Sequence, residues 1–527
     1  MKKGFLTLMT ILVLIGLILS GCAKQAPAPA PATTTAPAPT TAPAPVSKYG
    51  GTLIIGSSVS SQAFGYPPLI AFGAHSAAGP AIEYLLDFDI NGTPKPKLAK
   101  DFKIDVNAKT FTIFLREGVK FHDGTDCDAE AIKWNMEQFP IAKVPLLKSV
   151  TSIDVVDKWT VRLNLSSFSN ALLYDLVLAG GMVISPTAAK KNGIEWTYTH
   201  PVGTGPFKFE SFQRDVSLKY VKNENYWDKG KPYLDAIEIH YIADSVTREM
   251  ALKSGEVQAL VDYNLSSHAS LKAAGFTMKK APLGVFGLYP DSKNADSPFA
   301  KKEVREAVEY AIDKQAIVGA LGYGVWEPAY EEVASFRMGY CPDLQPRLYD
   351  PVKAKLLLGQ AGYPNGFKTT ILAQSTTNKD FLASLQSYLA AVGITANIEL
   401  LDMGKWNDYY YNGWHNGLFF WFTPSEPRSF DALNTSFAAD SIYNASVLKP
   451  AAAGELLKSG NQETDPAKLA ADVQGVVRIL SSEALTIPIM MQYHVGVENP
   501  NLRDTGMYDE SRCFKVHCTW ADAYFLK

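Results

Sequence analysis

The cysteines are the side chains of this chain that could do covalent chemistry, and their spacing narrows what that chemistry is. Of the five cysteines, Cys513 and Cys518 are close enough in sequence to pair, whereas Cys127 and Cys341 stand far from any other. No C-x-x-C pair and no cysteine–histidine spacing typical of a metal site occurs, so we expect no bound metal. A Cys513–Cys518 disulfide and buried free thiols both fit the sequence, because spacing alone does not fix connectivity.

The sequence also lacks the patterns of hydrolytic catalysis. A hydrolase brings a nucleophile, a base and an orienting group into one site, but neither G-x-S-x-G nor H-E-x-x-H occurs here. The two glycines that flank Thr204 predict a plain turn before a strand rather than a loop that cradles phosphate. His494 stands alone in sequence, and lone histidines more often pack or face solvent than bind a metal. We therefore expect neither an enzyme nor a cofactor.

The fifth cysteine, Cys22, ends a leader with the layout of an export signal. A lysine pair near the start precedes the apolar run 11–19, and Leu-Ser-Gly leads into Cys22. This end resembles the bacterial lipoprotein box, in which the thiol is alkylated by diacylglycerol and the leader is cut before the cysteine. The run is too short for an uncleaved spanning helix, which needs about 20 apolar residues. We expect a signal peptide over 1–21 and lipidation of Cys22.

A tether is expected to follow the lipidated cysteine. Residues 22–47 contain mainly Ala, Pro and Thr and no side chain that could build a core, so the segment is expected to be extended and solvated. At about 3.1 Å per residue, a proline-rich chain of this length reaches up to roughly 80 Å. The tether would hold a folded body away from the lipid.

Charge and length restrict the partners and the organisation of that body. The chain has 50 Lys and Arg against 53 Asp and Glu and no basic cluster, so nucleic acid is not expected as a partner. After the leader, no apolar stretch is long enough to span a bilayer, so any transport role requires separate membrane subunits. A chain of 527 residues exceeds what one hydrophobic core usually organises, and two or three lobes are expected.

Strand and helix patterns alternate along the body. Period-two apolar residues predict a strand at 109–116, a turn follows at 122–124, and Asp128 is a good N-cap for a helix. Glu303 and Arg305 are expected on the solvated face of another helix. The same patterns predict strands at 52–56, 155–165, 207–212, 218–221 and 237–242, and helices at 246–255, 302–321, 351–361, 379–392 and 467–483. Such a mixture indicates an α/β protein with more than one sheet.

A series of sequence blocks resembles one protein family. The block TFTIFLREGVKFHDGTDCDAEAIKW, within 99–134, is similar to the signature region of the family 5 extracellular solute-binding proteins, the dipeptide, oligopeptide and nickel receptors of ABC importers. Further blocks follow in the family's order, among them VGTGPFKFESF at 202–212, ALKSGEVQAL at 251–260 and LQSYLAAVGITANIEL at 385–400. The resemblance extends over 49–527.

The resemblance implies a fold and a division into parts. The family fold is α/β, a two-lobed clamp of the periplasmic-binding-protein type (type II, cluster C) with an extra subdomain in the first lobe. By analogy, lobe I comprises 48–86, 202–282 and 494–527, the extra subdomain 87–201, and lobe II 283–493. The ligand would lie between the lobes, which close by bending about the crossing segments. A monomer is expected.

The resemblance also places ligand contacts in loops at strand ends that face the cleft. Aromatic side chains suit such a receptor because they offer large apolar surfaces with defined stacking geometry. The segment GLFFWF at 417–422 fits a buried strand equally well, in which case its side chains belong to the core. The candidate ligand-binding residues are Phe64, Tyr66, Tyr263, Asn264, Trp326, Glu327, His415, Trp421, Phe422, Thr423 and Arg428.

One stretch departs from the peptide receptors of the family. Those receptors resemble one another in a Trp-x-x-Asp-x-x-Asp-Pro-like stretch whose first aspartate pairs with the peptide amino group. Here the stretch 421–427 reads WFTPSEP, in which Glu426 and Pro427 match the end but the first aspartate has no counterpart. The serines near 481 likewise stand where the nickel branch would have a histidine. The ligand is therefore expected to be a peptide or another small organic solute.

The expected function is that of a lipid-anchored receptor. The protein would capture its solute on the outer face or the periplasmic side of the cell membrane and deliver it to the permease and ATPase of an ABC importer. The same clamp could instead serve a solute sensor or a chaperone-like adaptor. A neighbouring permease–ATPase gene pair would favour import, whereas a lone gene beside a kinase would favour sensing.

Overall fold

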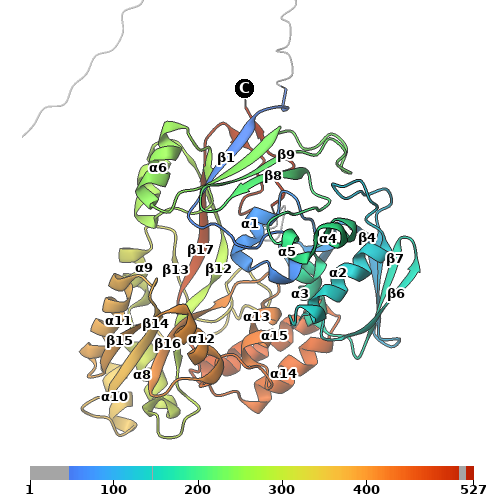
Figure 1. The fold of residues 1–527 in the computed structure, drawn as a ribbon. Coiled ribbons are helices and arrows are strands. Elements are labelled where there is room, and N and C mark those ends of the chain that lie inside the picture. The colour runs from blue at the N-terminus through green and yellow to red at the C-terminus, as the bar shows by residue number, and fades with distance from the viewer. Residues whose placement is uncertain (1–46, 145, 510–517, 527) are drawn as a thin grey trace, which may run out of the picture. The chain divides into compact units, whose positions relative to one another are not determined.

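The computed structural model describes residues 47–144, 146–509 and 518–526. The predictions for the signal peptide, for lipidation of Cys22, for the tether up to residue 46 and for Cys513 lie outside these ranges. An eleven-stranded sheet runs through the described part (Figure 1). In spatial order its strands are β15 (Thr395–Leu401), β14 (Lys368–Gln374), β16 (Gly417–Pro424), β12 (Thr277–Pro290), β17 (Ile487–Glu498), β11 (Ala259–Leu260), β1 (Thr52–Ser57), β10 (Ala236–Tyr241), β9 (Ser217–Lys222) and β8 (Phe207–Gln213), with β13 (Glu327–Pro328) paired to β17.

Two long antiparallel strands, β12 and β17, form the middle of this sheet and join its two groups of shorter strands (Figure 1). On one side β12 pairs with β16, and on the other β17 pairs with β11. Their register shifts at two places: between Phe286 and Gly287, and between Pro282, which is opposite Tyr493, and Gly284, which is opposite Gln492. The extra residue, Leu283, makes a bulge, and bulges bend a ladder locally.

The strands around β1 carry the first core. Leu53 and Ile55 of β1 are buried, and β1 runs parallel to both β10 and β11. Helical and strand segments along this part of the chain are η1 (Pro67–Leu69), η2 (Phe72–Ala74), α1 (His75–Ala78), α6 (Ser245–Ser254), η4 (Leu265–Ser267), α7 (His268–Ala273), β18 (Leu502–Arg503) and β19 (Tyr524–Phe525).

The turn around Thr204 is a packing feature. A Cβ on Gly203 would come within 2.0 Å of the Ala81 carbonyl oxygen, so the close backbone approach requires glycine there. Thr204 donates a hydrogen bond of 2.9 Å to Glu83, whose fully buried carboxylate also accepts 2.8 Å bonds from Tyr226 and Trp227. The glycines therefore allow a tight turn that holds a buried carboxylate, in agreement with the predicted turn.

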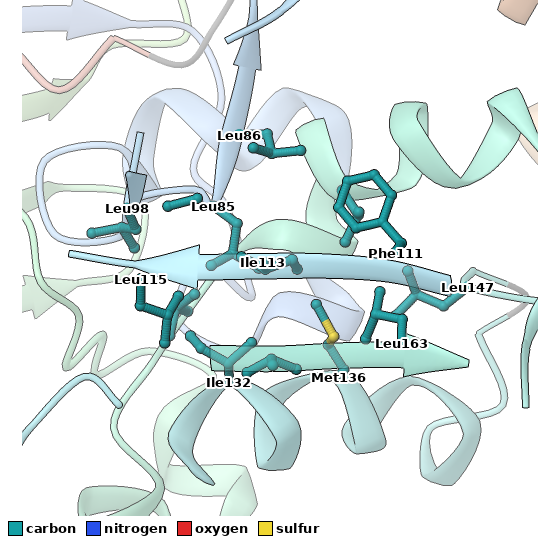
Figure 2. Close-up of a cluster of buried hydrophobic side chains, with 14 of the residues drawn as sticks. Leu85, Leu86, Leu98, Phe111, Ile113, Leu115, Ile132, Met136, Leu147 and Leu163 are labelled. Atoms are coloured by element: carbon teal, nitrogen blue, oxygen red, sulfur yellow. The ribbon is translucent and has the colours of Figure 1, made fainter. Parts of the chain in front are cut away.

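A separate four-stranded sheet has its own core (Figure 2). Its strands lie in the order β4 (Ala99–Asp105), β5 (Thr110–Leu115), β7 (Thr160–Leu165), β6 (Val150–Asp157), and α2 (Ala129–Ile141) packs across β7 and β6. Phe111, Ile113 and Leu115 of β5 are buried with Ile132 and Met136 of α2. The remaining elements of this region are β2 (Leu86–Phe88), β3 (Pro94–Pro96), α3 (Asn170–Val177), η3 (Ala179–Gly181), α4 (Pro186–Asn192) and α5 (Ile194–Thr197).

The strand and helix predictions for this region are confirmed in one place and wrong in another. Asp128 caps α2, because its Oδ1 accepts a hydrogen bond of 3.1 Å from the Ala131 amide. The single strand predicted at 155–165 is a hairpin of β6 and β7. Asp157 Oδ1 accepts a hydrogen bond of 2.8 Å from the Trp159 amide. This bond stabilises the turn between the end of β6 at Asp157 and the start of β7 at Thr160.

Helices dominate the region between β12 and β17. They are η5 (Pro298–Ala300), α8 (Lys302–Ala311), α9 (Lys314–Leu321), α10 (Pro351–Gln360), α11 (Lys379–Ala391), α12 (Met403–Asn412), α13 (Ser429–Phe437), α14 (Ala451–Gln462) and α15 (Pro466–Ser482). The one helix predicted at 302–321 is two, because Asp313 leaves helical geometry and caps α9 by accepting a 2.9 Å bond from Ala316. Across the described residues, no helix has the length and apolarity to span a membrane.

Arg305 corrects a second expectation in this region. It was expected on a solvated face, but it is 2% exposed. Its guanidinium donates to the Glu483 carbonyl at 2.7 and 2.9 Å and to the Phe299 carbonyl at 2.8 Å. The guanidinium therefore satisfies backbone carbonyls in η5 and at the end of α15 instead of facing water.

Candidate functional site

A cavity of about 670 Å³ lies where two parallel strands of the large sheet end. Ile55 of β1 lies beside Ala259 of β11, and the residues that follow the two strands, Ser58 and Val261–Asp262, line the cavity. Ligands of open α/β sheets bind at the carboxyl ends of the strands. The cavity therefore lies where this fold offers a binding site for a small molecule.

The cavity wall combines apolar surface with a few polar groups. Trp520 is 3% exposed, and Tyr508, which lies at the wall, donates a hydrogen bond of 2.6 Å to the Val261 carbonyl. Such a wall suits a small organic solute, because apolar contact supplies affinity and polar groups fix orientation. The lining residues are Ser57, Ser58, Val59, Ser61, Gln62, Ala63, Leu69, Ala71, Gly73, Ala74, Ser76, Val261, Asp262, Tyr493, His494, Val495, Met507, Tyr508, Cys518 and Trp520.

The acidic group of this cavity is already paired. Asp262 Oδ1 lies 2.7 Å from Arg248 Nη2, and Asp262 Oδ2 accepts a hydrogen bond from the Ser58 hydroxyl. Arg248 is 5% exposed and also donates 2.6 Å to the Ile242 carbonyl. The negative charge of Asp262 is thus balanced within the protein.

Two residues predicted in the loop after β1 pack behind the cavity. Phe64 is fully buried and meets Phe212 edge to face, with ring centroids 5.0 Å apart. Tyr66 is 3% exposed, and its hydroxyl donates a bond of 3.4 Å to Gln138. The loop itself reaches the cavity, through Val59, Ser61, Gln62 and Ala63.

The two residues predicted after β11 lie beside the cavity rather than in its wall. Tyr263 is 6% exposed and shares a hydrogen bond of 2.6 Å with His268 Nδ1. Burial raises the pKa of Tyr263 to about 12 and lowers the pKa of His268. Asn264 caps η4 by accepting from the Ser266 amide at 3.1 Å. The lining residue here is the preceding one, Asp262.

A second cavity, of about 380 Å³, lies beside β13. Glu327 lines it and accepts hydrogen bonds from the Tyr493 hydroxyl at 2.7 Å and from Lys280 at 3.4 Å. Trp326, predicted with Glu327, packs partly buried against the core of α8, α9 and α11. The other residues that line the second cavity are Val285, Pro328, Ala329, Tyr330, Glu331, Val333, Ala334, Ser335, Phe336, Tyr340, Cys341, Pro342, Leu344, Pro346 and Met491.

The aromatic segment 417–422 forms β16, so the reading as a buried strand is confirmed. Trp421 packs on Trp406 with ring centroids 4.2 Å apart, and Phe422 stacks on Phe286 at 4.6 Å. Thr423 is 2% exposed and hydrogen-bonds to Glu332 and, at 2.9 Å, to Tyr289. The linings of the two cavities include none of these three residues.

The two charged residues predicted near β16 lie elsewhere. His415 is exposed, and its two ring nitrogens lie 3.2 Å from Asp291 and from Asp296, which raises the pKa of His415. Arg428 is buried and donates to both oxygens of Asp431, at 2.7 and 3.0 Å. It also donates to the side chain and the carbonyl of Asn170, at 3.0 and 2.8 Å, and so connects α13 with α3.

The two cavities share one face of the crossing strand β17. Successive side chains of a strand alternate between faces, so Met491, Tyr493 and Val495 point the same way. Met491 lines the second cavity, and Tyr493 and Val495 line the first, together with His494 from the other face. The Tyr493–Glu327 hydrogen bond lies where the two cavities approach each other.

Sequence reasoning missed Tyr493, Trp520 and Glu331 as lining residues. Nothing local marks Tyr493 or Trp520, because both reach the cavity only through the return of the chain along β17 and past residue 518. Asp262 carried a signal, since it directly follows the apolar segment that became β11. Within the described ranges, no group of three or more His, Cys, Asp or Glu residues is placed to hold a metal ion.

Comparisons with known proteins give a consistent match. A family model described as "Bacterial extracellular solute-binding proteins, family 5 Middle" matches residues 93–444. The glutathione-binding protein GsiB of Shigella flexneri is 30% identical over 433 residues, which cover 77% of this chain and 82% of that protein. The Helicobacter pylori protein DppA in complex with peptide STSA has a TM-score of 0.76 at 24% identity, covering 91% of this chain and 99% of its own. AgaA of A. tumefaciens R10 in complex with agropinic acid has a TM-score of 0.76 at 25% identity, covering 90% and 99%.

Proposed function

Since the chain belongs to the bacterial extracellular solute-binding proteins of family 5, we propose that it captures a peptide or another small organic solute and delivers it to the permease of an ABC importer. The expected α/β fold of the periplasmic-binding-protein type is confirmed by the matches to solved structures. The observation that carries the proposal is the cavity of about 670 Å³ at the ends of β1 and β11, beside the strands that join the two halves of the sheet.

The crossing strands support closure around a solute. The bulge at Leu283 opposite Gln492 and Tyr493 is a natural bending point, because a bulge weakens the ladder locally. We place the lobe boundaries there, with 48–86, 202–282 and 494–527 in lobe I, 87–201 in its extra subdomain and 283–493 in lobe II. Bending would bring the β13 segment over the first cavity and remove the solute from water.

The names of similar proteins support a small polar solute. The relatives include a glutathione-binding protein, a structure with peptide STSA and a structure with agropinic acid. A cavity of about 670 Å³ falls within the range of roughly 300–1,000 Å³ that is usual for small-molecule sites. The protein binds and releases its solute without chemistry, as a receptor and not an enzyme.

The position of the receptor follows from its first 47 residues. Cys22 carries the lipid that holds the protein at the outer face or the periplasmic side of the cell membrane. The Ala/Pro/Thr segment lets the monomeric body turn and dock on its permease. The lipoprotein box and the composition of the segment support this part of the proposal.

Solute binding can be tested on the first cavity with a matched pair of variants. Val59 lines the cavity and is 69% exposed, whereas Val352 in α10 is 78% exposed and lines neither of the two cavities. We expect native mass spectrometry of the full chain to find a co-purified solute, and calorimetry to detect binding of STSA, glutathione or agropinic acid. Val59→Trp should weaken that binding at least tenfold by filling the cavity, and Val352→Trp should not. Absence of any bound solute, or equal effects of the two variants, would refute the proposal.

A further inference from the structure

The second cavity has an apolar floor and aromatic walls. Val285, Ala329 and Met491 form the floor and are each at most 8% exposed. Three aromatic residues, Tyr330, Phe336 and Tyr340, line the same space, and Phe336 is 49% exposed. Arg337 lies over the Phe336 ring at 5.1 Å and Lys314 over the Tyr330 ring at 4.9 Å, so among the described contacts Tyr340 is the lining ring that no cation covers.

One carboxylate of this cavity has an unused oxygen. Glu331 lines the cavity and is 6% exposed. Its Oε1 accepts a hydrogen bond of 3.0 Å from the Cys341 amide, but its Oε2 has no hydrogen-bond partner among the described residues. Leaving a buried acceptor unsatisfied is unfavourable, more so when it is charged, so a donor supplied by a ligand would be favoured there.

The charges around Glu331 leave room for a cation. Arg478 attracts the carboxylate but is paired with Asp343 at 2.6 Å, while Asp343 and the adjacent Glu332 repel it. Burial is the largest influence and raises the pKa of Glu331 to about 7. The other carboxylate of the cavity, Glu327, already has Tyr493 and Lys280 as partners. Three carboxylates line the two cavities, those of Asp262, Glu327 and Glu331, and among the described residues only Glu331 lacks an ion-pair partner.

We propose that this cavity binds the ammonium group of an amine-bearing solute, with Glu331 Oε2 accepting its hydrogen bond and the ring of Tyr340 beside the cation. The inference rests on the proposed function in that the amine belongs to the transported solute. The shared face of β17 supports this, because a solute in the first cavity can extend past Tyr493 into the second.

An ammonium bound here requires the ionised carboxylate, so binding depends on pH. The fraction of ionised Glu331 rises about tenfold between pH 6 and pH 8 when its pKa is about 7. The apparent affinity scales with the competent fraction and should therefore be about tenfold weaker at pH 6 than at pH 8. Besides burial, the pKa of Glu331 is lowered by Arg478 and raised by Glu332 and Asp343. Glu331 in turn adds to burial in raising the pKa of the Cys341 thiol.

The test compares a cation with its neutral counterpart. Benzylammonium and benzyl alcohol have similar size, and their binding to the full chain can be measured by ligand-observed NMR at pH 8. We expect benzylammonium to bind at least tenfold more tightly than benzyl alcohol. Glu331→Gln should abolish that preference, because the amide carries no charge. The matched control is Glu332→Gln, which replaces the neighbouring buried glutamate that does not line the cavity and should retain the preference.

The result distinguishes this inference from the proposed function. Equal binding of benzylammonium and benzyl alcohol, or a preference that survives Glu331→Gln, would overturn the ammonium site. If solutes bind in a Val59-dependent way but the preference is absent, only the ammonium site fails. If the preference for benzylammonium is present but Val59→Trp weakens the binding of no solute, the proposed capture in the first cavity fails and the ammonium site stands.

Discussion

Asp262 and Glu331 are carboxylates that line the two cavities beside β17, but they differ in their ion-pair and hydrogen-bond partners. Asp262 has an arginine 2.7 Å away and the Ser58 hydroxyl as a donor. Glu331 has a single backbone amide, from Cys341, and its second oxygen is unsatisfied within the described residues. The Asp262 carboxylate therefore stabilises the wall of its cavity, whereas Glu331 keeps one oxygen that can accept a hydrogen bond from a ligand.

The difference teaches that a cavity-lining charge is not by itself a ligand contact. Arg248 binds the Ile242 carbonyl as well as Asp262, so the pair joins the end of β10 to the end of β11. Removing one partner of such a pair leaves the other uncompensated, whereas neutralising an unpaired buried carboxylate removes a cost. Substitutions at the two sites should therefore act in opposite directions on stability.

The largest effect is expected from Arg248→Met. This change leaves Asp262 without its ion-pair partner and the Ile242 carbonyl without its donor, and it should lower the free energy of unfolding by about 3 kcal/mol. Urea denaturation followed by circular dichroism measures the loss. The control is Arg162→Met, which breaks an exposed pair with Asp154 whose side chains are 45% and 42% exposed, and which should lower the stability far less. Similar losses in both variants would show that the Arg248–Asp262 pair is no more than a surface contact.

The sequence predicted the general position of the first cavity but not its walls. Residues after strands were expected to face the site, and the loop after β1 and the end of β11 do so. The prediction selected the aromatic residues Phe64 and Tyr263, which are buried, over the smaller Ser61 and Asp262, which line the cavity. Side-chain size indicates how much area a residue can bury, but not whether it buries that area in a ligand or in the core.

The limits of local patterns appear again in the second half of the chain. The N-cap Asp128 was predicted from the sequence, because capping depends only on the next three residues. The break at Asp313 was missed because the apolar pattern continues across it. Glu331 gave no signal, because its burial depends on packing of the β13 segment against Val285 and Met491, which are distant in sequence.

An effect of opposite sign is expected from Glu331→Gln. The pKa of Glu331 is raised from 4.5 to about 7, so between these pH values the folded state keeps a proton that the unfolded state has lost. The wild type is therefore most stable relative to the variant below pH 4.5 and loses this advantage as the pH rises through 7. Relative to the wild type, the variant should be about 3 kcal/mol more stable at pH 8 than it is at pH 4.5, because each pKa unit corresponds to about 1.4 kcal/mol.

Thermal unfolding of both proteins from pH 4.5 to pH 8 measures that change. The midpoint difference between variant and wild type should move in favour of Glu331→Gln with rising pH and then level off above pH 8. A constant difference across the range would mean that Glu331 titrates normally and is solvated. In that case the contrast with Asp262 would disappear, because both carboxylates would be satisfied.

The smallest effect concerns the residue between the two cavities. Tyr493→Phe removes the 2.7 Å hydrogen bond to Glu327, whose side chain is 52% exposed and keeps Lys280 as a neighbour. A bond to a half-exposed acceptor should contribute about 0.5 kcal/mol. Because the Tyr493 hydroxyl bonds to Glu327 and not to Glu331, the double variant with Glu331→Gln should show additive changes within about 0.5 kcal/mol in urea denaturation. A larger coupling energy would mean that the two cavities respond as one unit, and the separate treatment of Asp262 and Glu331 would then have to be replaced by a single charge network along β17.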